Sequence, residues 1–134
     1  MAVVVFDADV LIAYLNRDDA HHAAALERMR RALEPANRRV VSAVNYTEVL
    51  IGPLQAAGPA GAATVDAMIA RLRIETIDVG VPLARRAADV RVRTRLKLPD
   101  AYAVAIAADA SRKGDDEVRL ESFDERVISA YAAL

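Results

Sequence analysis

The chain of 134 residues contains no cysteine and no tryptophan, and it has only two histidines. Without cysteine there is neither a disulfide framework nor a thiolate that could ligate zinc or act as a nucleophile. Four tyrosines and two phenylalanines are too few to form an extended platform for stacked bases. His21 and His22 are adjacent, and neighbouring helical side chains point about 100° apart. We therefore expect no shared ligand site or acid–base pair from them, but a solvated helix face.

Long apolar runs are also missing, and charge of neither sign dominates. No apolar run approaches the roughly 20 residues of a membrane span, and the first residues lack the pattern of a signal peptide. We expect a soluble, cytoplasmic protein with no membrane contact. The net charge of −1 argues against general attraction to nucleic acid, although all of the 18 basic residues except Lys97 and Lys113 are arginine. Any basic surface must therefore be local.

Hydrophobic residues make up 54 % of the chain, which is enough for one core, so we expect one domain over residues 1–134. Strand and helix signals alternate, which is typical of an α/β fold. The expected strands are 2–6, 38–42, 74–77 and 117–121. Seven helices are expected. The first begins at Val10, and the third ends at Ile51. The others cover 19–34, 62–72, 82 to about 93, 99–112 and 124–133. Gly52-Pro53 predicts a helix break followed by a mobile stretch, and residues 113–116 predict a turn.

Four acidic residues stand where an apolar run or a proline gives way to the start of an expected helix. They are Asp7, Glu48, Asp100 and Asp124. In an open parallel sheet, ligands bind in the crevice beyond the carboxyl ends of the strands. If these ends meet at one edge, the edge gathers carboxylates, and carboxylates collected in this way bind divalent metal.

Each acid also has a simpler explanation as a helix cap. Asp7 or Asp9 can cap the first helix, Asn45 to Glu48 and Ser122 to Glu125 have the spacing of capping boxes, and Asp100 follows Pro99 in a first turn. Capping explains one acid at a time. It does not explain a set at one edge, because mutual repulsion would oppose folding and raise pKa values unless a cation were bound.

Four segments resemble motifs of the PIN-domain family, and most of all the VapC-type ribonuclease toxins of type II toxin–antitoxin systems. The segments are VVFDADVLI at 4–12, NYTEVLIG at 45–52, LKLPDA at 96–101 and SFDER at 122–126. They cover nearly the whole chain in the family's order and at typical separations. LPDA and SFDER are the most specific of them.

The resemblance implies a three-layer α/β/α domain with a central, mainly parallel sheet of four to five strands, and an endoribonuclease dependent on Mg²⁺ or Mn²⁺. Asp7, Glu48, Asp100 and Asp124 match the family's acidic quartet, and Ser122 matches its strand-end hydroxyl. Two departures stand out. Asp9 occupies a position where Ser, Thr or Asn is usual, which adds a negative charge to the site. Arg119 and Glu121 make the fourth strand unusually polar.

The chemistry of the residues fits this function. Hard carboxylate oxygens are the ligands that Mg²⁺ selects, and a bound metal acidifies water for attack on phosphorus. We expect Asp7, Asp100 and Glu48 at or next to the metal, with Asp124 bound through water or to a second metal. The resemblance also implies products with 5′-phosphate and 3′-hydroxyl ends.

Binding of RNA needs cations around this acidic centre. A run of basic residues precedes Asp100 and could contact phosphates, or could equally form a solvated helix face. It consists of Arg85, Arg86, Arg91, Arg93, Arg95 and Lys97. With so few aromatic residues, recognition of RNA shape is favoured over recognition of an extended single strand.

The resemblance also implies protein partners, namely a second copy in a homodimer and a cognate antitoxin that packs along the early helices. Apolar residues at 13–15 and at 49–54 are candidates for the antitoxin contact, although core packing explains most of them. The antitoxin would present a basic side chain to the acids.

Two other functions compete with this one. Val5-Phe6-Asp7-Ala8-Asp9-Val10 resembles the nucleophile loop of haloacid-dehalogenase phosphatases, but the lysine in Lys113-Gly114-Asp115-Asp116 sits directly against Gly-Asp, so the order and spacing fail. A non-catalytic interaction module with the same fold is the other alternative, and the presence of all four acids argues against it.

Overall fold

Four parallel strands form the centre of the computed structural model, which describes residues 2–114 and 117–134. They are β1 (Ala2–Phe6), β2 (Arg38–Ser42), β3 (Ile74–Ile77) and β4 (Glu117–Glu121), in the spatial order β3-β2-β1-β4. Val5 of β1 lies opposite Val40 on one side and Leu120 on the other. The four expected strands are confirmed, whereas the turn expected at 113–116 falls partly outside the described residues.

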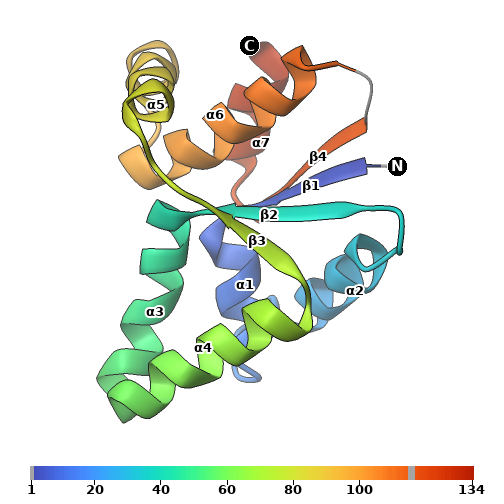
Figure 1. Ribbon diagram of the computed structural model, residues 1–134, viewed down its shortest axis with the longest axis vertical. Helices are drawn as coiled ribbons and strands as arrows, with labels where there is room; N and C mark the ends of the chain where they lie inside the picture. Colours follow the sequence, from blue (N-terminus) through green and yellow to red (C-terminus); the bar gives the residue numbers. More distant parts are fainter. Residues whose placement is uncertain (1, 115–116) are drawn as a thin grey trace.

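Helices cover both faces of the sheet. They are α1 (Ala8–Leu15), α2 (His22–Ala32), α3 (Ala43–Ala57), α4 (Pro59–Arg71), α5 (Val81–Thr94), α6 (Leu98–Arg112) and α7 (Glu125–Ala133). In Figure 1, α1 to α4 lie below the sheet and α5 to α7 lie above it. The expected three-layer α/β/α architecture is therefore confirmed. None of these helices, within the described part of the chain, is long and apolar enough to cross a membrane.

Strand β1 lies in the middle of the core, which explains its unbroken apolar sequence. All five of its residues are buried. Val3 and Val5 pack with α5, α6 and α7 on one face, and Val4 and Phe6 pack with α1 to α4 on the other. A parallel strand covered on both faces needs apolar side chains at every position. The residue that follows this central strand is Asp7.

The break expected at Gly52-Pro53 is wrong, because α3 continues through both residues to Ala57. Proline removes one backbone hydrogen bond from a helix interior, but packing against α4 holds this turn in place. A Cβ atom built on Gly61 of α4 would lie 1.9 Å from the carbonyl oxygen of Pro53, so the two helix backbones touch. The helix ends at Gly58 instead, where φ is +58° and the N–H donates to the carbonyl of Leu54. Helix α4 then starts at Pro59 rather than at 62.

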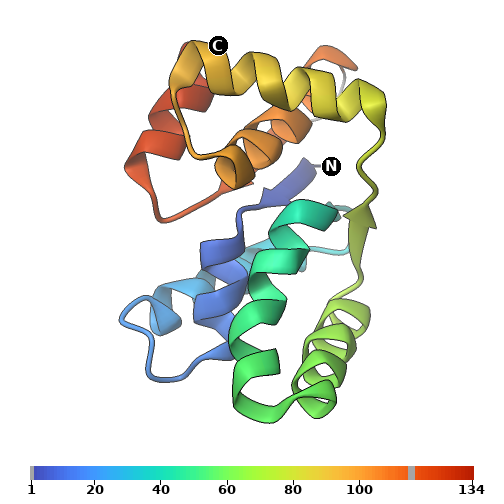
Figure 2. The same cartoon turned by 90° about the vertical axis from the view of Figure 1, so that its left-hand side faces the viewer.

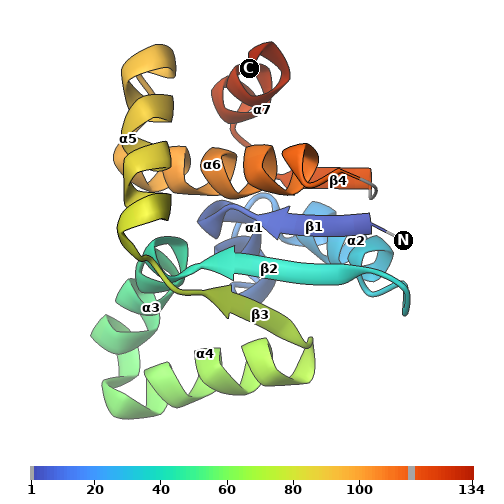
Figure 3. The same cartoon turned by 45° about the horizontal axis from the view of Figure 1, so that its top comes forward.

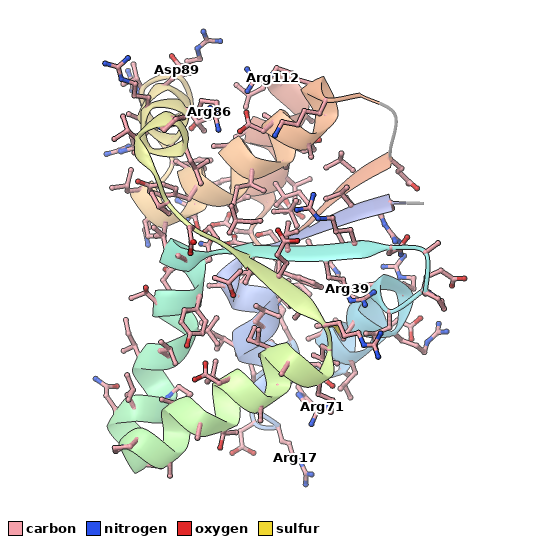
Figure 4. The ribbon with its side chains drawn as sticks, in the orientation of Figure 1. Arg17, Arg39, Arg71, Arg86, Asp89 and Arg112 are labelled. Carbon is pink, nitrogen blue, oxygen red and sulfur yellow. The ribbon has the colours of Figure 1, made fainter. Side chains whose placement is uncertain are left out.

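Helix α2 is shorter than the expected 19–34, because local turns and one arginine define its ends. Before it, the backbone N–H of His21 donates to Asp19 Oδ1 at 2.8 Å. After it, the buried Arg39 of β2 donates to the carbonyl of Ala32, at the end of α2, and to that of Leu72, just after α4. Figure 4 shows Arg39 between these elements. One guanidinium thus satisfies carbonyls from two helix ends.

Strands β1, β2 and β3 all point the same way, as seen most clearly in Figure 3. Helix α1 begins two residues after β1, and α3 begins directly after β2. Figure 2 looks at the molecule from this side and shows α1, α3 and the start of α6 near one another. The edge where the strands end therefore gathers the starts of several helices.

Candidate functional site

Asp7 lies at the centre of this edge, between β1 and α1, and is 3 % exposed. Its backbone N–H donates to the carbonyl of Glu121, which extends the pairing of β1 with β4. Its Oδ1 accepts a hydrogen bond from the N–H of Ala8, and its Oδ2 accepts one from the Ser122 hydroxyl at 2.9 Å. Asp7 therefore caps α1 and at the same time contacts the strand-end hydroxyl of β4.

Burial raises the pKa of Asp7 from 3.8 to about 7. The negative charges of Asp9 and Asp100 add to this rise, and the hydrogen bonds from Ser122 and Ala8 oppose it. A carboxyl with a pKa this high is costly to ionise at neutral pH. A cation nearby would remove that cost.

Asp9 joins the site from the first turn of α1. Its Oδ2 accepts hydrogen bonds from the N–H of Phe123 at 2.8 Å and from the Ser122 hydroxyl at 3.4 Å. Its Oδ1 is buried and has no hydrogen-bond partner. Burial is the main cause that raises the pKa of Asp9. The extra acid thus ties α1 to the segment after β4 and leaves one carboxylate oxygen unsatisfied.

Glu48 and Asp100 come from different helices and are joined through Asn45. The fully buried Asn45 donates from Nδ2 to Glu48 Oε1 at 3.1 Å and to the carbonyl of Pro99 at 3.1 Å. Asp100 follows Pro99 in the first turn of α6. The alternative explanation of Glu48 by a capping box over 45–48 is wrong, because Asn45 and Glu48 lie inside α3 and the cap is Ser42, whose Oγ accepts from the N–H of Asn45.

Burial is the first cause that raises the pKa of both Glu48 and Asp100. The charge of Asp100 also raises the pKa of Glu48, that of Asp124 raises the pKa of Asp100, and that of Asp9 raises the pKa of both. Lys97, just before α6, opposes the rise in each case.

Asp124 caps α7 and faces an arginine. Its Oδ1 accepts from the N–H of Arg126 at 2.9 Å, and its Oδ2 accepts from Arg126 Nη2 at 3.0 Å. This contact is the main cause that lowers the pKa of Asp124. The cap expected at Ser122 is wrong, since the Ser122 hydroxyl instead accepts from the N–H of Asp124 and donates to Asp7.

The sequence-predicted acids therefore share one edge, but three of the four are oriented by neighbours of their own. Asp7 binds Ser122, Glu48 binds Asn45, and Asp124 binds Arg126. Within residues 2–114 and 117–134, no three acidic or histidine side chains converge closely enough to hold a metal ion as they stand. The donor set nevertheless fits a hard cation, because the buried Asp9 Oδ1 lacks a partner and burial disfavours the charge of Asp7.

Two side chains of this edge were missed by the sequence analysis as parts of the site. Asn45 joins α3 to α6, and Arg126 brings positive charge to Asp124 and Asp100. The signals were present, since each stands within three residues of a predicted acid. Nothing in the sequence showed which way their side chains would turn.

The basic residues before Asp100 divide into two groups. Arg86 forms an ion pair with Asp109 of α6, which also pairs with Arg112, and Arg93 pairs with Asp89. Figure 4 shows Arg86, Asp89 and Arg112 at the α5 and α6 side of the molecule. Arg85, Arg91, Arg95 and Lys97 are exposed. Of this run, Lys97 lowers the pKa of Glu48 and Asp100, whereas Arg86 and Arg93 pair with acids of α6 and α5.

An apolar groove of about 660 Å³ begins at Glu48 and runs between α1 and α3. Ile12 and Leu15 line one side, and Ile51 and Pro53 line the other. Ile51 is 53 % exposed, whereas Val49 is 1 % exposed and belongs to the core. Of the two apolar faces expected to bind a partner, parts of each therefore remain available at the surface.

The two histidines do not simply face solvent as expected. His21 precedes α2 and stacks on Phe123, with ring centroids 4.6 Å apart. His22 Nδ1 lies 2.7 Å from the carbonyl oxygen of Ala13. Both rings therefore have partners outside α2, although His21 is exposed as expected and His22 is half-buried.

The sequence model of the PIN domain matches residues 4–134, so the chain belongs to the PIN domain family. This agrees with the parallel sheet and with the acids at its edge. A search of curated proteins by sequence gave no match.

Solved structures share the fold at low sequence identity. VapC20 of Mycobacterium tuberculosis, described as a toxin that cleaves the sarcin–ricin loop, has a TM-score of 0.73 and 19 % identity, over 97 % of this chain and 95 % of that one. VapBC-1 of nontypeable Haemophilus influenzae has a TM-score of 0.67 and 13 % identity, over 100 % and 95 %. VapBC2 of Rickettsia felis, bound to a DNA fragment from its promoter, has a TM-score of 0.59 and 12 % identity, over 90 % and 98 %.

The phosphatase alternative loses its support in this fold. The lysine that its motif offered, Lys113, follows the last residue of α6, whereas Asp100 lies in the first turn of that helix. A helix of this length separates its ends by roughly 20 Å. Lys113 instead lines a pocket with Val3 and Arg38, at the start of β1 and β2.

Proposed function

We propose that this chain is a metal-dependent endoribonuclease that acts as the toxin of a toxin–antitoxin pair. Membership of the PIN domain family, with four acids and a buried hydroxyl at the family's edge of the sheet, is the observation that supports this function most strongly. The structural likeness to VapC20 and to two VapBC complexes agrees with it.

Asp7, Glu48 and Asp100 would hold Mg²⁺ or Mn²⁺, with Asp124 contributing through water or to a second ion. When bound, the metal supplies positive charge at the scissile phosphate and lowers the pKa of a water molecule. The buried Oδ1 of Asp9 and the raised pKa of Asp7 support a cation at this position. Asp9 would then replace the usual neutral residue with one more carboxylate oxygen.

The chain's own residues prepare the site for RNA. Ser122 fixes the orientation of Asp7 by its hydroxyl, and Asn45 fixes Glu48 relative to the start of α6. Lys97 and Arg126 would offset repulsion between the acids and the phosphates of RNA. The exposed Arg91 and Arg95 lie on the approach from α5 and would contact phosphates farther along the strand. Cleavage would leave 5′-phosphate and 3′-hydroxyl ends.

A cognate antitoxin would bind the groove between α1 and α3. The groove is apolar along Ile12, Ile51 and Pro53 and opens at Glu48, so an amphipathic helix fits it with a basic residue directed to the acids. Such a residue would compensate the acidic cluster when metal is absent. A homodimer and a cytoplasmic location accord with this function.

Cleavage of RNA in the presence of Mg²⁺, Mn²⁺ or a chelator tests the proposal, followed by mapping of the product ends. A structured loop such as the sarcin–ricin loop is the first substrate to try, because VapC20 shares the fold and cleaves it. The wild type should cleave only with metal, and Asp100→Asn should be inactive while remaining folded. Equal rates for the two proteins would contradict the assignment of the site.

A further inference from the structure

Arg28 of α2 reaches across to the end of β4, which is more than 90 residues away in sequence. Its Nη1 atom donates to Glu121 Oε1 at 3.1 Å and to the backbone carbonyl of Ser122 at 2.9 Å. Glu121 is only 7 % exposed, so Arg28 supplies the charge partner for a buried carboxylate. Removal of this partner would leave that charge uncompensated.

The same arginine contacts the next residue, Phe123, through its guanidinium face. The Cζ atom lies 4.6 Å from the centre of the Phe123 ring, and His21 stacks on that ring at the same centroid distance. His21 at the N-cap of α2 and Arg28 within the helix therefore both contact this one aromatic ring.

The segment held in this way carries the polar contacts of the acidic edge. The Ser122 hydroxyl donates to Asp7, the N–H of Phe123 donates to Asp9, and the N–H of Asp124 donates to the Ser122 hydroxyl. Helix α2 therefore contacts residues 121–123, and Asp7 and Asp9 bind residues 122 and 123 of the same segment. The contacts of Arg28 and those of the two acids thus meet in one short stretch of backbone.

We propose that Arg28 is a positioning residue that holds Ser122 and Asp124 in place for the acidic edge. Arg28 touches neither the acids of the edge nor, under the nuclease function on which this role rests, the RNA. It acts through the backbone of Ser122 and the ring of Phe123. Loss of its guanidinium releases the segment, and the Ser122 hydroxyl then loses its fixed position against Asp7.

Amide hydrogen exchange of the metal-free protein, followed by NMR, tests this role without any catalytic measurement. In Arg28→Met, which keeps an apolar stem against Phe123, the amides of Phe123 and Asp124 should exchange at least about tenfold faster than in the wild type. The amides of Val4 and Val5 in the core should be unchanged. Arg28→Lys keeps a cation that can donate to both acceptors, and it should restore slow exchange.

Arg30→Met is the matched control, because Arg30 lies on the same helix and pairs only with Glu27 of that helix among its described contacts. It should leave the Phe123 and Asp124 amides at the wild-type rate. If Arg28→Met does not fold, Arg28→Gln provides the same test with a polar side chain. Wild-type exchange in Arg28→Met or Arg28→Gln, or equal acceleration of all amides, would overturn the positioning role.

Titration with Mn²⁺ separates this inference from the proposed function. Arg28→Met and Ser122→Ala should each weaken Mn²⁺ binding, and the loss in the double variant should be smaller than the sum of the two single losses, because both changes remove the same positioned hydroxyl. Additive losses would contradict action through Ser122. A wild type that binds no Mn²⁺ and cleaves no RNA would refute the nuclease, whereas the exchange rates would still decide the role of Arg28.

Discussion

Ser122 donates its hydroxyl hydrogen to Asp7 over 2.9 Å, although the two residues are 115 positions apart. The contact follows from the pairing of β1 with β4, which sets Phe6 opposite Glu121 and leaves the next residues side by side. Asp7 is thus held by the strand that is formed from the last part of the described chain. The Asp7 carboxyl is buried, it is held in one orientation, and its pKa is about 7. It is therefore the most informative group to titrate.

Asp7 should make the metal-free protein less stable as the pH rises. Its pKa is raised in the folded state to about 7, so the folded state binds this proton more tightly than the unfolded chain. The stability that it contributes is present below about pH 4 and is lost as the pH rises to about 7. At about 1.4 kcal/mol per pKa unit, the loss is at most roughly 4 kcal/mol. Urea unfolding in chelator at several pH values measures it.

Asp7→Asn is the control for this pH dependence, because it removes the ionisable group and keeps the volume. The variant should match the wild type near pH 4 and exceed it in free energy of unfolding near pH 8. If both proteins lost the same stability between these values, Asp7 would not be the group responsible.

Divalent metal should raise the melting temperature of the wild type, since a ligand that binds only the folded state stabilises it. Asp100→Asn should reduce this increase, because it removes one carboxylate charge from the edge. Asp18→Asn changes an exposed acid in the loop before α2 and serves as the control. Differential scanning fluorimetry across millimolar Mg²⁺ and Mn²⁺ makes the comparison. Identical metal effects in all three proteins would favour simple helix caps.

Asp9 should oppose folding by its charge and support it by its hydrogen bond. Asp9→Asn removes the charge and keeps an oxygen that can accept from the N–H of Phe123, so the metal-free protein should gain about 1 kcal/mol. Asp9→Ala also removes the acceptor, and it should be less stable than Asp9→Asn by about 1–3 kcal/mol. Chemical unfolding in chelator measures both. Equal stability of the two variants would show that the Phe123 contact contributes nothing.

Gly61 should tolerate no side chain, whereas Gly52 should accept one. A Cβ atom at Gly61 would lie 1.9 Å from the Pro53 carbonyl oxygen, so Gly61→Ala must separate α3 from α4 and should cost about 2–4 kcal/mol. At Gly52, inside α3, a Cβ atom would meet nothing within 4 Å. Gly52→Ala should therefore stabilise the protein by about 0.5–1 kcal/mol. The two melting temperatures should move in opposite directions.

A charge placed in the groove between α1 and α3 should block the proposed antitoxin without blocking cleavage. Ile51 is 53 % exposed and lines this groove, so Ile51→Asp should abolish inhibition by the partner while RNA cleavage by the free enzyme persists. Leu26→Asp is the control, since Leu26 is 46 % exposed but belongs to α2. Inhibition assays with the co-expressed partner distinguish them, and inhibition that survives Ile51→Asp would place the partner elsewhere.

The strands could be predicted because their signal is local. Val3 to Phe6 form an apolar run, and an apolar run covered on both faces has few alternatives to a buried parallel strand. The same holds for the position of the acids, which the ends of β1, β2 and β4 and the start of α6 determine. The fold and the four acids therefore followed from neighbouring residues in the sequence.

The orientation of the side chains could not be predicted, since it depends on distant contacts. Asn45 looked like a helix cap, but in the structure it donates to the carbonyl of Pro99 in another helix. Gly52-Pro53 looked like a break, but the contact with Gly61 keeps α3 continuous. Arg28 gave no signal at all, because its partners lie at the far end of the chain. In these cases a tertiary contact, and not the local sequence preference, determines the conformation of the residue.

The order of the strands in space also determines when the edge is completed during synthesis of the chain. A nascent chain that has been translated only through α6 already contains Asp7, Glu48 and Asp100. In this chain β1 can pair with β2 but not yet with β4, its other neighbour in the sheet. The nascent chain lacks Ser122, Asp124 and the strand that covers one side of β1. The protein thus acquires the full set of acids and the hydroxyl only when β4 and the start of α7 leave the ribosome, and chains terminated before β4 carry an incomplete edge.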